Sequence, residues 1–290
     1  LEMKKAVVFI KGGFGNQLFQ FAFANFLKEK NFNVKINTDF LSENNRHTKR
    51  NLMFSKKISG FSEQMYLNKK MFNLFLTMNT SSRFSNSFFK KYKYTKEYSQ
   101  NLNDYDTIIF FNGYWKDISY PESSKNFILN MLRQFEVIDD KLKSKVETDR
   151  ALIHVRRRDF IKNNWDLDIS YFEDSINLLR SKSESIVFDV FTDDFDWVSS
   201  QKIFDIADNI YAQTSKTSLP NEQDDFDETI ETFTSMLNYQ HYIVGNSSFS
   251  FWAAFLSSTE SSIVTVPDPW FKNNQHPVLR KENWFTVSNS

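Results

Sequence analysis

The sequence predicts an α/β protein that consists of two Rossmann-like domains facing a cleft. Short apolar segments alternate with stretches of helical periodicity in two separate series, and such alternation is typical of parallel sheets covered by helices. The chain of 290 residues is 40% hydrophobic, which is enough to bury a substantial core. We therefore expect an amino-terminal domain at residues 3–145 and a carboxyl-terminal domain at residues 146–290.

The first series begins with Ala6–Ile10, a continuous apolar run that suits a strand buried on both faces. A helical stretch and a second strand complete a β–α–β unit. The pattern is irregular from Thr38 to Tyr98, where we expect helices and loops, and we interpret Tyr92-Lys93-Tyr94 as a solvated helix face. The expected elements are a strand at 6–10, a helix at 16–30, strands at 32–37 and 107–111, and a helix at 126–146.

The second series begins with the apolar run Ala151–Val155, which we expect to form another buried strand. Strands and helices then alternate to the end of the chain, which predicts a second parallel sheet. The expected elements are strands at 151–155, 186–192, 242–244 and 263–266, and helices at 171–180, 197–204, 227–239 and 247–256.

Composition excludes several kinds of function. Lys plus Arg and Asp plus Glu both number 36, so the formal net charge is zero and nothing favours nucleic acid as a partner. The chain has no cysteine, which rules out disulfides and thiolate metal sites. The apolar runs are far shorter than the roughly 20 residues of a membrane span, and no signal-peptide pattern follows Met3. We expect a cytoplasmic location, with at most peripheral contact at the inner membrane face.

A glycine-rich turn follows the first strand and contains Gly12, Gly13, Gly15, Asn16 and Gln17. Glycine lets a ligand approach the backbone, and the helix that follows offers free N–H groups. The spacing differs from the G-x-G-x-x-G of dinucleotide-binding proteins, and a tight structural connection explains the glycines equally well. The adjacent amides favour an anion or sugar site because they donate and accept several hydrogen bonds.

A cluster of arginines leaves the carboxyl end of the strand at 151–155, in the segment His154-Val155-Arg156-Arg157-Arg158-Asp159. Open α/β sheets bind ligands at this end of their strands. Guanidinium groups bind phosphate oxygens in a bidentate manner and stay charged, so they can neutralise a departing diphosphate. The structural alternative is a basic surface patch with an ordinary ion pair to Asp159.

Two acidic residues, Asp193 and Asp194, end the strand at 186–192. A carboxylate here can accept hydrogen bonds from the ring N–H and amine of guanine, or it can cap the next helix. Asp194-Phe195-Asp196 also has the D-x-D spacing of some metal-dependent sugar-nucleotide enzymes. Because the same spacing recurs at 104–106 and 166–168, we assign no metal site.

A polar segment, Gly245-Asn246-Ser247-Ser248-Phe249-Ser250, lies between the strand at 242–244 and an apolar helix. Its hydroxyl and N–H groups point toward the same edge of the predicted sheet. Helix capping alone would account for these residues.

Together the four segments resemble the α-1,2-fucosyltransferase family of bacterial surface-glycan synthesis. The segment 12–22 is similar to G-G-L-G-N-Q-[LM]-F-Q-Y-A, 154–159 to H-x-R-R-x-D, 191–194 to F-S-D-D, and 246–252 to N-S-S-F-S-W-W. The departures are Phe14, Phe21, Thr192 and Phe251, and none of them removes a charge.

The resemblance implies a GT-B-type glycosyltransferase fold, GDP-fucose as donor, inversion at the anomeric carbon and no requirement for a metal or cofactor. Arg156 would contact the β-phosphate, with Arg157 and Asp159 in support, and Asn16 would approach the fucose. The other donor-binding residues that the resemblance implies are His154 and one of Asp193 and Asp194 near guanine, Asn246, Ser247 and Ser248 at phosphate oxygens, and Gly12, Gly13, Gly15, Gln17 and Ser250.

The acceptor that the resemblance implies is a terminal galactose of an O-antigen-like oligosaccharide, free or linked to a lipid, and the general base stays unassigned. Two alternatives remain open at this point. One is a fucosyltransferase with another linkage or acceptor, and the other is a nucleotide-sugar-binding protein without catalysis, for which the same arginines would suffice.

Overall fold

The computed structural model divides the chain into two compact units, Leu1–Phe135 and Glu136–Ser290. The division lies earlier in the chain than the expected boundary between residues 145 and 146. The structure describes the residues 3–42, 52–54, 60–63, 66–80, 91–99, 107–138, 147–212, 222–272 and 278–289.

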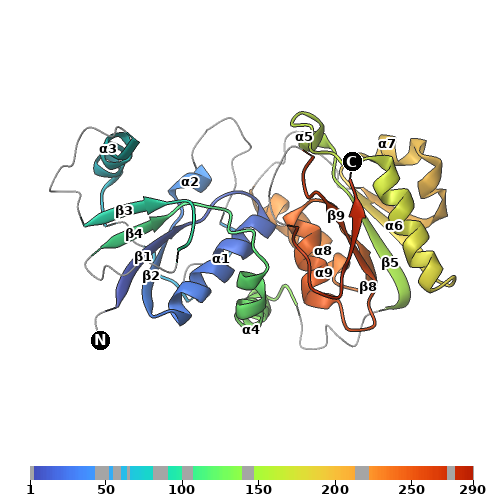
Figure 1. Ribbon diagram of the computed structural model, residues 1–290, viewed down its shortest axis with the longest axis horizontal. Helices are drawn as coiled ribbons and strands as arrows, with labels where there is room; N and C mark the ends of the chain where they lie inside the picture. Colours follow the sequence, from blue (N-terminus) through green and yellow to red (C-terminus); the bar gives the residue numbers. More distant parts are fainter. Residues whose placement is uncertain are drawn as a thin grey trace. The chain divides into compact units, whose positions relative to one another are not determined.

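Unit 1 contains a four-stranded sheet in the order β2-β1-β4-β3, and all neighbouring strands run parallel (Figure 1). The central strand β1 is buried from Ala6 onward, as its unbroken apolar sequence predicts. The elements described in unit 1 are β1 (Lys4–Phe9), α1 (Phe14–Glu29), β2 (Phe32–Asn37), α2 (Asp39–Ser42), α3 (Lys69–Thr80), β3 (Tyr92–Thr95), β4 (Ile108–Phe111) and α4 (Ser119–Gln134).

Phenylalanine fills much of the core of unit 1. Phe110 of β4 packs against Phe9 of β1 and against Phe72 and Phe75 of α3, with ring centroids 5.1 to 6.2 Å apart. On the helix α1, Phe23 stacks on Trp115 with ring centroids 3.9 Å apart. These rings lie in the interior, so the abundance of phenylalanine serves packing.

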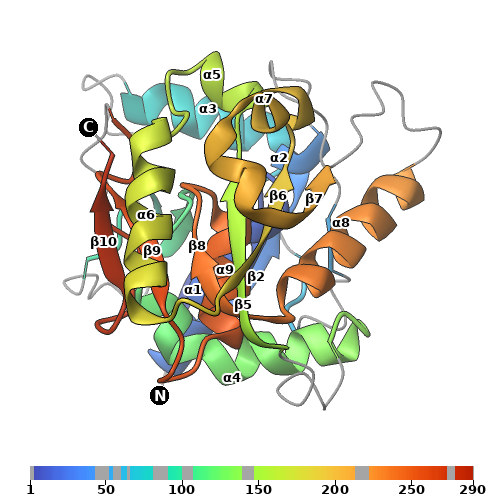
Figure 2. The same cartoon turned by 90° about the vertical axis from the view of Figure 1, so that its right-hand side faces the viewer.

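Unit 2 contains a six-stranded parallel sheet in the order β10-β9-β8-β5-β6-β7. Figure 2 shows α6 in front of this sheet and α9 behind it, so both faces are covered. The elements described in unit 2 are β5 (Glu147–Val155), α5 (Arg158–Ile161), α6 (Ile169–Lys182), β6 (Val187–Thr192), α7 (Phe195–Ser200), the 3₁₀ helix η3 (Lys202–Ile206), β7 (Ala207–Ala212), α8 (Glu222–Met236), β8 (Tyr239–Ile243), α9 (Ser248–Ser257), β9 (Val264–Asp268) and β10 (Phe285–Ser288).

Two parallel sheets in two units confirm the predicted α/β class, and β5 lies at the centre of the second sheet. The chain proceeds from β5 outward to β6 and β7, and then returns to β8 on the other side of β5. The carboxyl end of β5 is therefore the point at which the strand order reverses, where doubly wound sheets bind their ligands.

Two predicted helices differ from the observed ones. The helix predicted at 126–146 is α4, which begins at Ser119 and ends at Gln134, because Glu136 adopts a left-handed φ of 57°. Residues 139–146 lie outside the described part of the chain. The helix predicted at 197–204 divides into α7 and η3, because Gln201 between them is extended.

Three edge strands were missed. The prediction of a helix face at Tyr92-Lys93-Tyr94 is wrong, since this segment is β3, and Tyr92 packs on Phe110 of the neighbouring strand. β7 and β10 were not predicted at all. Both are largely exposed edge strands, so they lack the continuous apolar run that reveals a strand buried on both faces.

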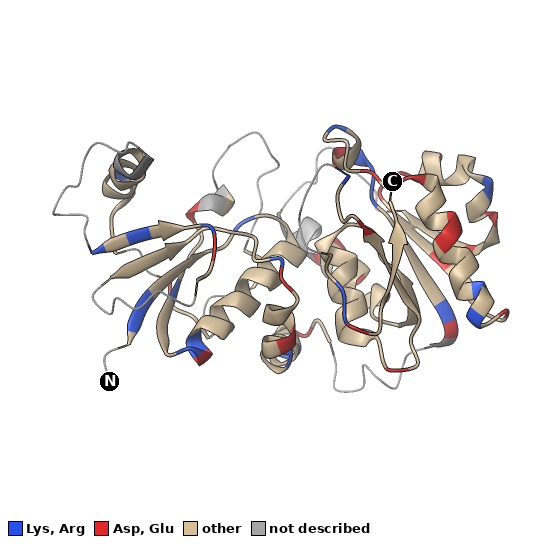
Figure 3. Cartoon of the chain, viewed as in Figure 1, with Lys and Arg blue, Asp and Glu red and all other residues tan. Residues whose placement is uncertain are grey.

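Charges of both signs are interspersed over both units, in keeping with equal numbers of acidic and basic residues (Figure 3). Across the described ranges, no helix is both long enough and apolar enough to cross a bilayer.

Candidate active site

Three adjacent strands of unit 2 end at the same edge of the sheet, because β8, β5 and β6 are neighbours and parallel. Arg156 follows β5, Asp193 follows β6, and Asn246 follows β8 and precedes α9. The sheet thus brings together three of the four segments that the sequence singled out. The fourth, the glycine-rich turn, belongs to unit 1.

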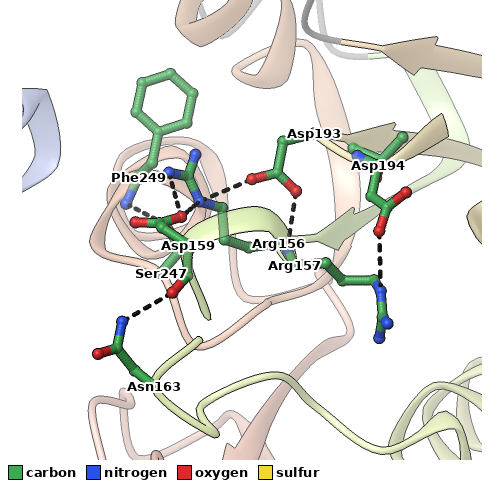
Figure 4. Close-up of polar contacts among 9 residues, drawn as sticks. Arg156, Arg157, Asp159, Asn163, Asp193, Asp194, Ser247 and Phe249 are labelled. Carbon is green, nitrogen blue, oxygen red and sulfur yellow. Dashed lines mark hydrogen bonds and ion pairs between the residues drawn. The ribbon is translucent and has the colours of Figure 1, made fainter. Parts of the chain in front are cut away.

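Arg156 is held by two carboxylates and keeps one nitrogen open. Its Nη2 donates to Asp159 Oδ1 at 2.8 Å, and its Nε lies 3.0 Å from both Asp159 Oδ1 and Asp193 Oδ2 (Figure 4). Its Nη1 has no hydrogen bond or ion pair within the described part of the chain, and 27% of the side chain is exposed. Arg156 therefore presents a fixed cationic donor to the carboxyl edge of the sheet.

Arg157 contacts two carboxylates and an aromatic ring. Its Nε lies 3.2 Å from Asp194 Oδ2, its Nη1 lies 3.2 Å from Asp166 Oδ2, and its guanidinium carbon lies 3.8 Å above the ring of Trp197. Only 14% of the side chain is exposed. Figure 4 shows the contact with Asp194. Together the three contacts make Arg157 a positioning residue that anchors the turn after β5.

Asp193 and Asp194 hold the two arginines in this structure. Asp193 is 4% exposed, and its Oδ1 accepts from the backbone N–H of Arg157 at 2.8 Å while its Oδ2 pairs with Arg156. Asp194 pairs with Arg157 and also accepts from the backbone N–H of Trp197, which caps α7. The capping role proposed from sequence is therefore present, and contact with guanine stays a prediction.

His154 is a buried, neutral imidazole. Burial, and then the charge of Arg156, lower its pKa to about 3. A Cβ on Gly245 would lie 2.7 Å from the backbone oxygen of His154, so only glycine fits beside it. Its Nδ1 is buried without a hydrogen-bond partner among the described residues. Such an atom needs a partner, which a water molecule or a ligand would supply.

The start of α9 supplies further polar groups at the same edge. Asn246 donates its amide N–H to the backbone oxygen of Trp165, and its buried Oδ1 has no partner in the described chain. Ser247 caps α9 by accepting from the backbone N–H of Phe249. Ser248 is half-buried in the first turn, whereas the hydroxyl of Ser250 bonds the backbone oxygens of Gly245 and Ser247. Ser250 therefore stabilises the turn.

The buried side chain of Gln17 fixes the glycine-rich turn of unit 1. Gln17 is fully buried, donates to the backbone oxygen of Gly12 at 3.0 Å and accepts from the backbone N–H of Met53 at 2.9 Å. Gly12 has a φ of 76°, and a Cβ there would lie 2.9 Å from Asn16 Nδ2. Gly13 has open space around it, whereas Gly15 is buried in the first turn of α1. Gln17 therefore shapes the turn, and Asn16 and Gly13 form its half-buried surface.

The D-x-D patterns serve other purposes where they are described. Asp166 pairs with Arg157 and Asp168 pairs with Lys272. Residues 104–106 lie outside the described part of the chain. Among the residues that the structure describes, no group of three or more His, Cys, Asp or Glu side chains could hold a metal ion.

Sequence reasoning did not identify Asp166 and Trp197, which fix Arg157. Trp197 lies three residues after Asp194, so its position in the first turn of α7 was a signal that it could face the strand end. Asp166 lies in the segment between α5 and α6, and no local pattern connects it with Arg157.

Comparison with known proteins finds relatives over nearly the whole chain. The family described as "Glycosyl transferase family 11" matches residues 6–288. An α-1,2-colitosyltransferase of Escherichia coli is 26% identical over 290 residues, which cover 94% of both chains. The O-antigen biosynthesis glycosyltransferase WbnK of Escherichia coli is 27% identical over 315 residues and covers 96% of this chain and 99% of its own. The solved NodZ α-1,6-fucosyltransferase soaked with GDP-fucose gives a TM-score of 0.45 at 12% identity and covers 88% of this chain and 92% of its own.

Proposed function

Since this chain belongs to glycosyl transferase family 11, we propose that it transfers L-fucose from GDP-fucose to the 2-hydroxyl of a terminal galactose. The observation that carries the proposal is Arg156, whose guanidinium is fixed by two carboxylates at the strand-order reversal. Among the described residues nothing pairs with its Nη1, so this nitrogen is available to a phosphate oxygen. The resemblance of four segments to the α-1,2-fucosyltransferases supports the donor and the linkage.

The proposed reaction is a direct displacement with inversion. The acceptor oxygen forms a bond to the anomeric carbon of fucose, the bond from that carbon to the β-phosphate oxygen breaks, and GDP leaves with the electron pair. The proton of the acceptor hydroxyl passes to a base that we leave unassigned. Negative charge grows on the β-phosphate as the bond breaks, so a preorganised arginine stabilises the transition state more than the ground state.

Other groups at the strand ends fit a bound GDP-sugar. The N–H groups at the start of α9, with Ser247 and Ser248, suit phosphate oxygens because a helix amino terminus favours anions. The unpaired Nδ1 of His154 and Oδ1 of Asn246 suit hydrogen-bonding groups of the nucleotide. In unit 1, Asn16 remains our candidate for contact with the fucose.

We propose that the reaction needs no metal ion. A guanidinium carries a permanent charge, so Arg156, through its Nη1, and the start of α9 would supply the charge neutralisation that a divalent cation provides elsewhere.

The biological role that we propose is assembly of an O-antigen-like surface glycan, with a galactose-terminated oligosaccharide or lipid-linked glycan as acceptor. The role is supported by the WbnK relative, whose name places it in O-antigen biosynthesis. A lipid-linked acceptor would bring the protein to the inner face of the membrane by peripheral contact.

A second candidate donor is GDP-colitose. The α-1,2-colitosyltransferase relative favours it, and colitose differs from fucose only in lacking the 3-hydroxyl. Both donors would use the same guanine and diphosphate contacts. A hydrogen bond to the 3-hydroxyl would therefore decide between them.

The test measures GDP release from GDP-fucose and GDP-colitose in the presence of EDTA, with and without a β-galactoside. We expect acceptor-dependent release from GDP-fucose and a new α-1,2 linkage by NMR. Faster turnover of GDP-colitose would identify colitose, instead of fucose, as the transferred sugar. Activity that depends on added Mg²⁺ or Mn²⁺ would contradict the proposal that the reaction needs no metal ion. GDP binding without product from any galactoside would favour a binding protein.

A further inference from the structure

A lysine–tyrosine face lies in unit 1 at the carboxyl ends of β1 and β4, and we define it as Lys11, Tyr114 and Lys116. Tyr114 is 46% exposed. The Nζ of Lys11 lies 4.6 Å from the centroid of its ring, and the Nζ of Lys116 lies 5.8 Å from it. An exposed aromatic ring thus lies within 6 Å of two lysine Nζ atoms at the carboxyl edge of a parallel sheet, the edge at which such sheets bind ligands.

Lys11 is held in a fixed position. Its backbone N–H donates to Gln20 Oε1 at 2.8 Å, and its Nζ donates to Asn112 Oδ1 at 2.7 Å. Across the described residues no carboxylate pairs with this ammonium group. Burial, and then the nearby charge of Lys96, lower its pKa. The fold therefore keeps a half-buried cation beside a like charge, which costs stability unless an anion binds there.

The face adjoins the glycine-rich turn. A Cβ built on Gly12 would lie 3.4 Å from Cε1 of Tyr114 and 2.9 Å from Nδ2 of Asn16, so the tyrosine ring and the asparagine amide both line the backbone of Gly12. Asn16 is the residue expected to contact the transferred sugar. A molecule that stacks on Tyr114 would therefore lie beside Asn16.

We propose that the lysine–tyrosine face binds an acidic acceptor glycan, in which one sugar ring stacks on Tyr114 and the carboxylate of a uronic acid pairs with Lys11 and Lys116. An aromatic ring suits the apolar face of a sugar, and ammonium groups form charge-assisted hydrogen bonds to carboxylates. This inference rests on the proposed function, since it names the chemistry of the acceptor. The diphosphate of a carrier lipid offers the same anionic chemistry, so the test distinguishes these two sources.

The test compares three galactosides that differ only in the group linked to galactose: glucuronic acid, glucose, and a short-chain lipid diphosphate. Binding to the wild-type protein with GDP is measured by calorimetry, and KM and kcat are measured with the donor. We expect the glucuronide to bind about tenfold more tightly than the glucoside and to have a correspondingly lower KM. Equal affinity for these two compounds would overturn the proposal, and a preference for the diphosphate over both would assign the anion to the carrier.

The variants Lys11→Met and Lys116→Met remove one charge each and keep the length of the side chain. We expect each variant to lose most of the preference for the glucuronide, measured as the ratio of the dissociation constants of the glucuronide and the glucoside. Lys70→Met is the matched control, because Lys70 is exposed on α3. Retention of the full preference in both lysine variants would contradict the inference.

Tyr114→Phe and Tyr114→Leu test the stacking contact without changing a charge. We expect phenylalanine to retain affinity for both galactosides, and leucine to lower both affinities by the same factor. An unchanged affinity of Tyr114→Leu for both galactosides would contradict the proposal that a sugar ring stacks on Tyr114. Calorimetry measures acceptor binding without turnover. It therefore tests the lysine–tyrosine face even if the protein does not transfer fucose, and the kinetic measurements test the transfer reaction separately.

Discussion

The two turns that follow the central strands of the two sheets present opposite kinds of surface. After β5 in unit 2, the guanidinium groups of Arg156 and Arg157 are already paired with carboxylates. After β1 in unit 1, the surface consists of glycine backbone, the amide of Asn16 and the ammonium group of Lys11. Among the described residues, this ammonium group contacts Asn112 and the ring of Tyr114 and pairs with no carboxylate.

The two turns differ in how their charged groups are paired. Paired carboxylates fix the arginines in advance, so the transition state gains their charge without a cost of reorganisation. The turn of unit 1 keeps an ammonium charge without a carboxylate, which suits recognition of a partner of opposite charge. In our proposal, unit 2 therefore serves the chemical step and unit 1 serves selection among acceptors.

The largest expected effect on activity comes from replacing Arg156, which tests the role of the turn in unit 2. We expect Arg156→Ala to lower kcat by about 10²–10³-fold, because one preorganised charge at the leaving group is removed. Arg156→Lys should also be slow, since an ammonium group lacks the planar fork. The matched control is Arg158→Ala, two positions along the same turn, where the side chain is exposed. Similar kinetics for the Arg156→Ala and Arg158→Ala variants would contradict the assigned role.

The second effect concerns packing at the turn of unit 2. We expect Gly245→Ala to lower the free energy of unfolding by about 1–3 kcal/mol, because the new Cβ would lie 2.7 Å from the backbone oxygen of His154. Tryptophan fluorescence during urea unfolding reports mainly on unit 2. The tryptophans in unit 2 are Trp165, Trp197, Trp252, Trp270 and Trp284. An unchanged midpoint in urea would show that β5 and β8 can move apart without loss.

The third effect is a pH dependence of stability. The folded-state pKa of His154, about 3, lies below its ordinary value of 6.5, so between these values the unfolded chain binds a proton that the folded chain does not. The stabilisation is complete above about pH 6.5 and is lost as the pH falls, with a slope of at most about 1.4 kcal/mol per pH unit.

Unfolding free energies at pH 7, 6 and 5 test this, with His154→Asn as the comparison. In the variant, the free energy of unfolding should depend less steeply on pH, and the difference in slope should correspond to at most about one bound proton. His241, whose pKa is also lowered by burial, is present in both proteins and does not affect the difference. Identical slopes would mean that His154 is accessible to protons in the folded state.

The smallest effect on stability should come from Gly13→Ala in unit 1. The added Cβ meets nothing within 4 Å, and the φ of −76° suits alanine, so we expect the unfolding free energy to change by less than about 0.5 kcal/mol. Activity should nevertheless fall if a ligand approaches this backbone. Full activity would remove Gly13 from the site and weaken the comparison between the two turns.

The sequence by itself determined most of the central elements. Strands such as β1 and β5 are buried on both faces, so their residues form unbroken apolar runs, and the helices between them follow a helical rhythm. The segment 154–159 could be placed at a strand end because it follows such a run. The missed strands β3, β7 and β10 lie at sheet edges, where one face or more is exposed and the run is interrupted.

Only the tertiary structure decided how the site residues divide their work. Adjacent arginines look alike in sequence, yet their contacts differ. Arg157 contacts Asp166, Asp194 and the ring of Trp197 and is 14% exposed. Arg156 pairs with Asp159 and Asp193 and is 27% exposed. These contacts join segments from different strand ends and loops, and they arise because the order of the parallel strands brings those ends to one edge. Local periodicity reports how each segment is buried, but it carries no record of which distant carboxylate lies opposite which guanidinium group.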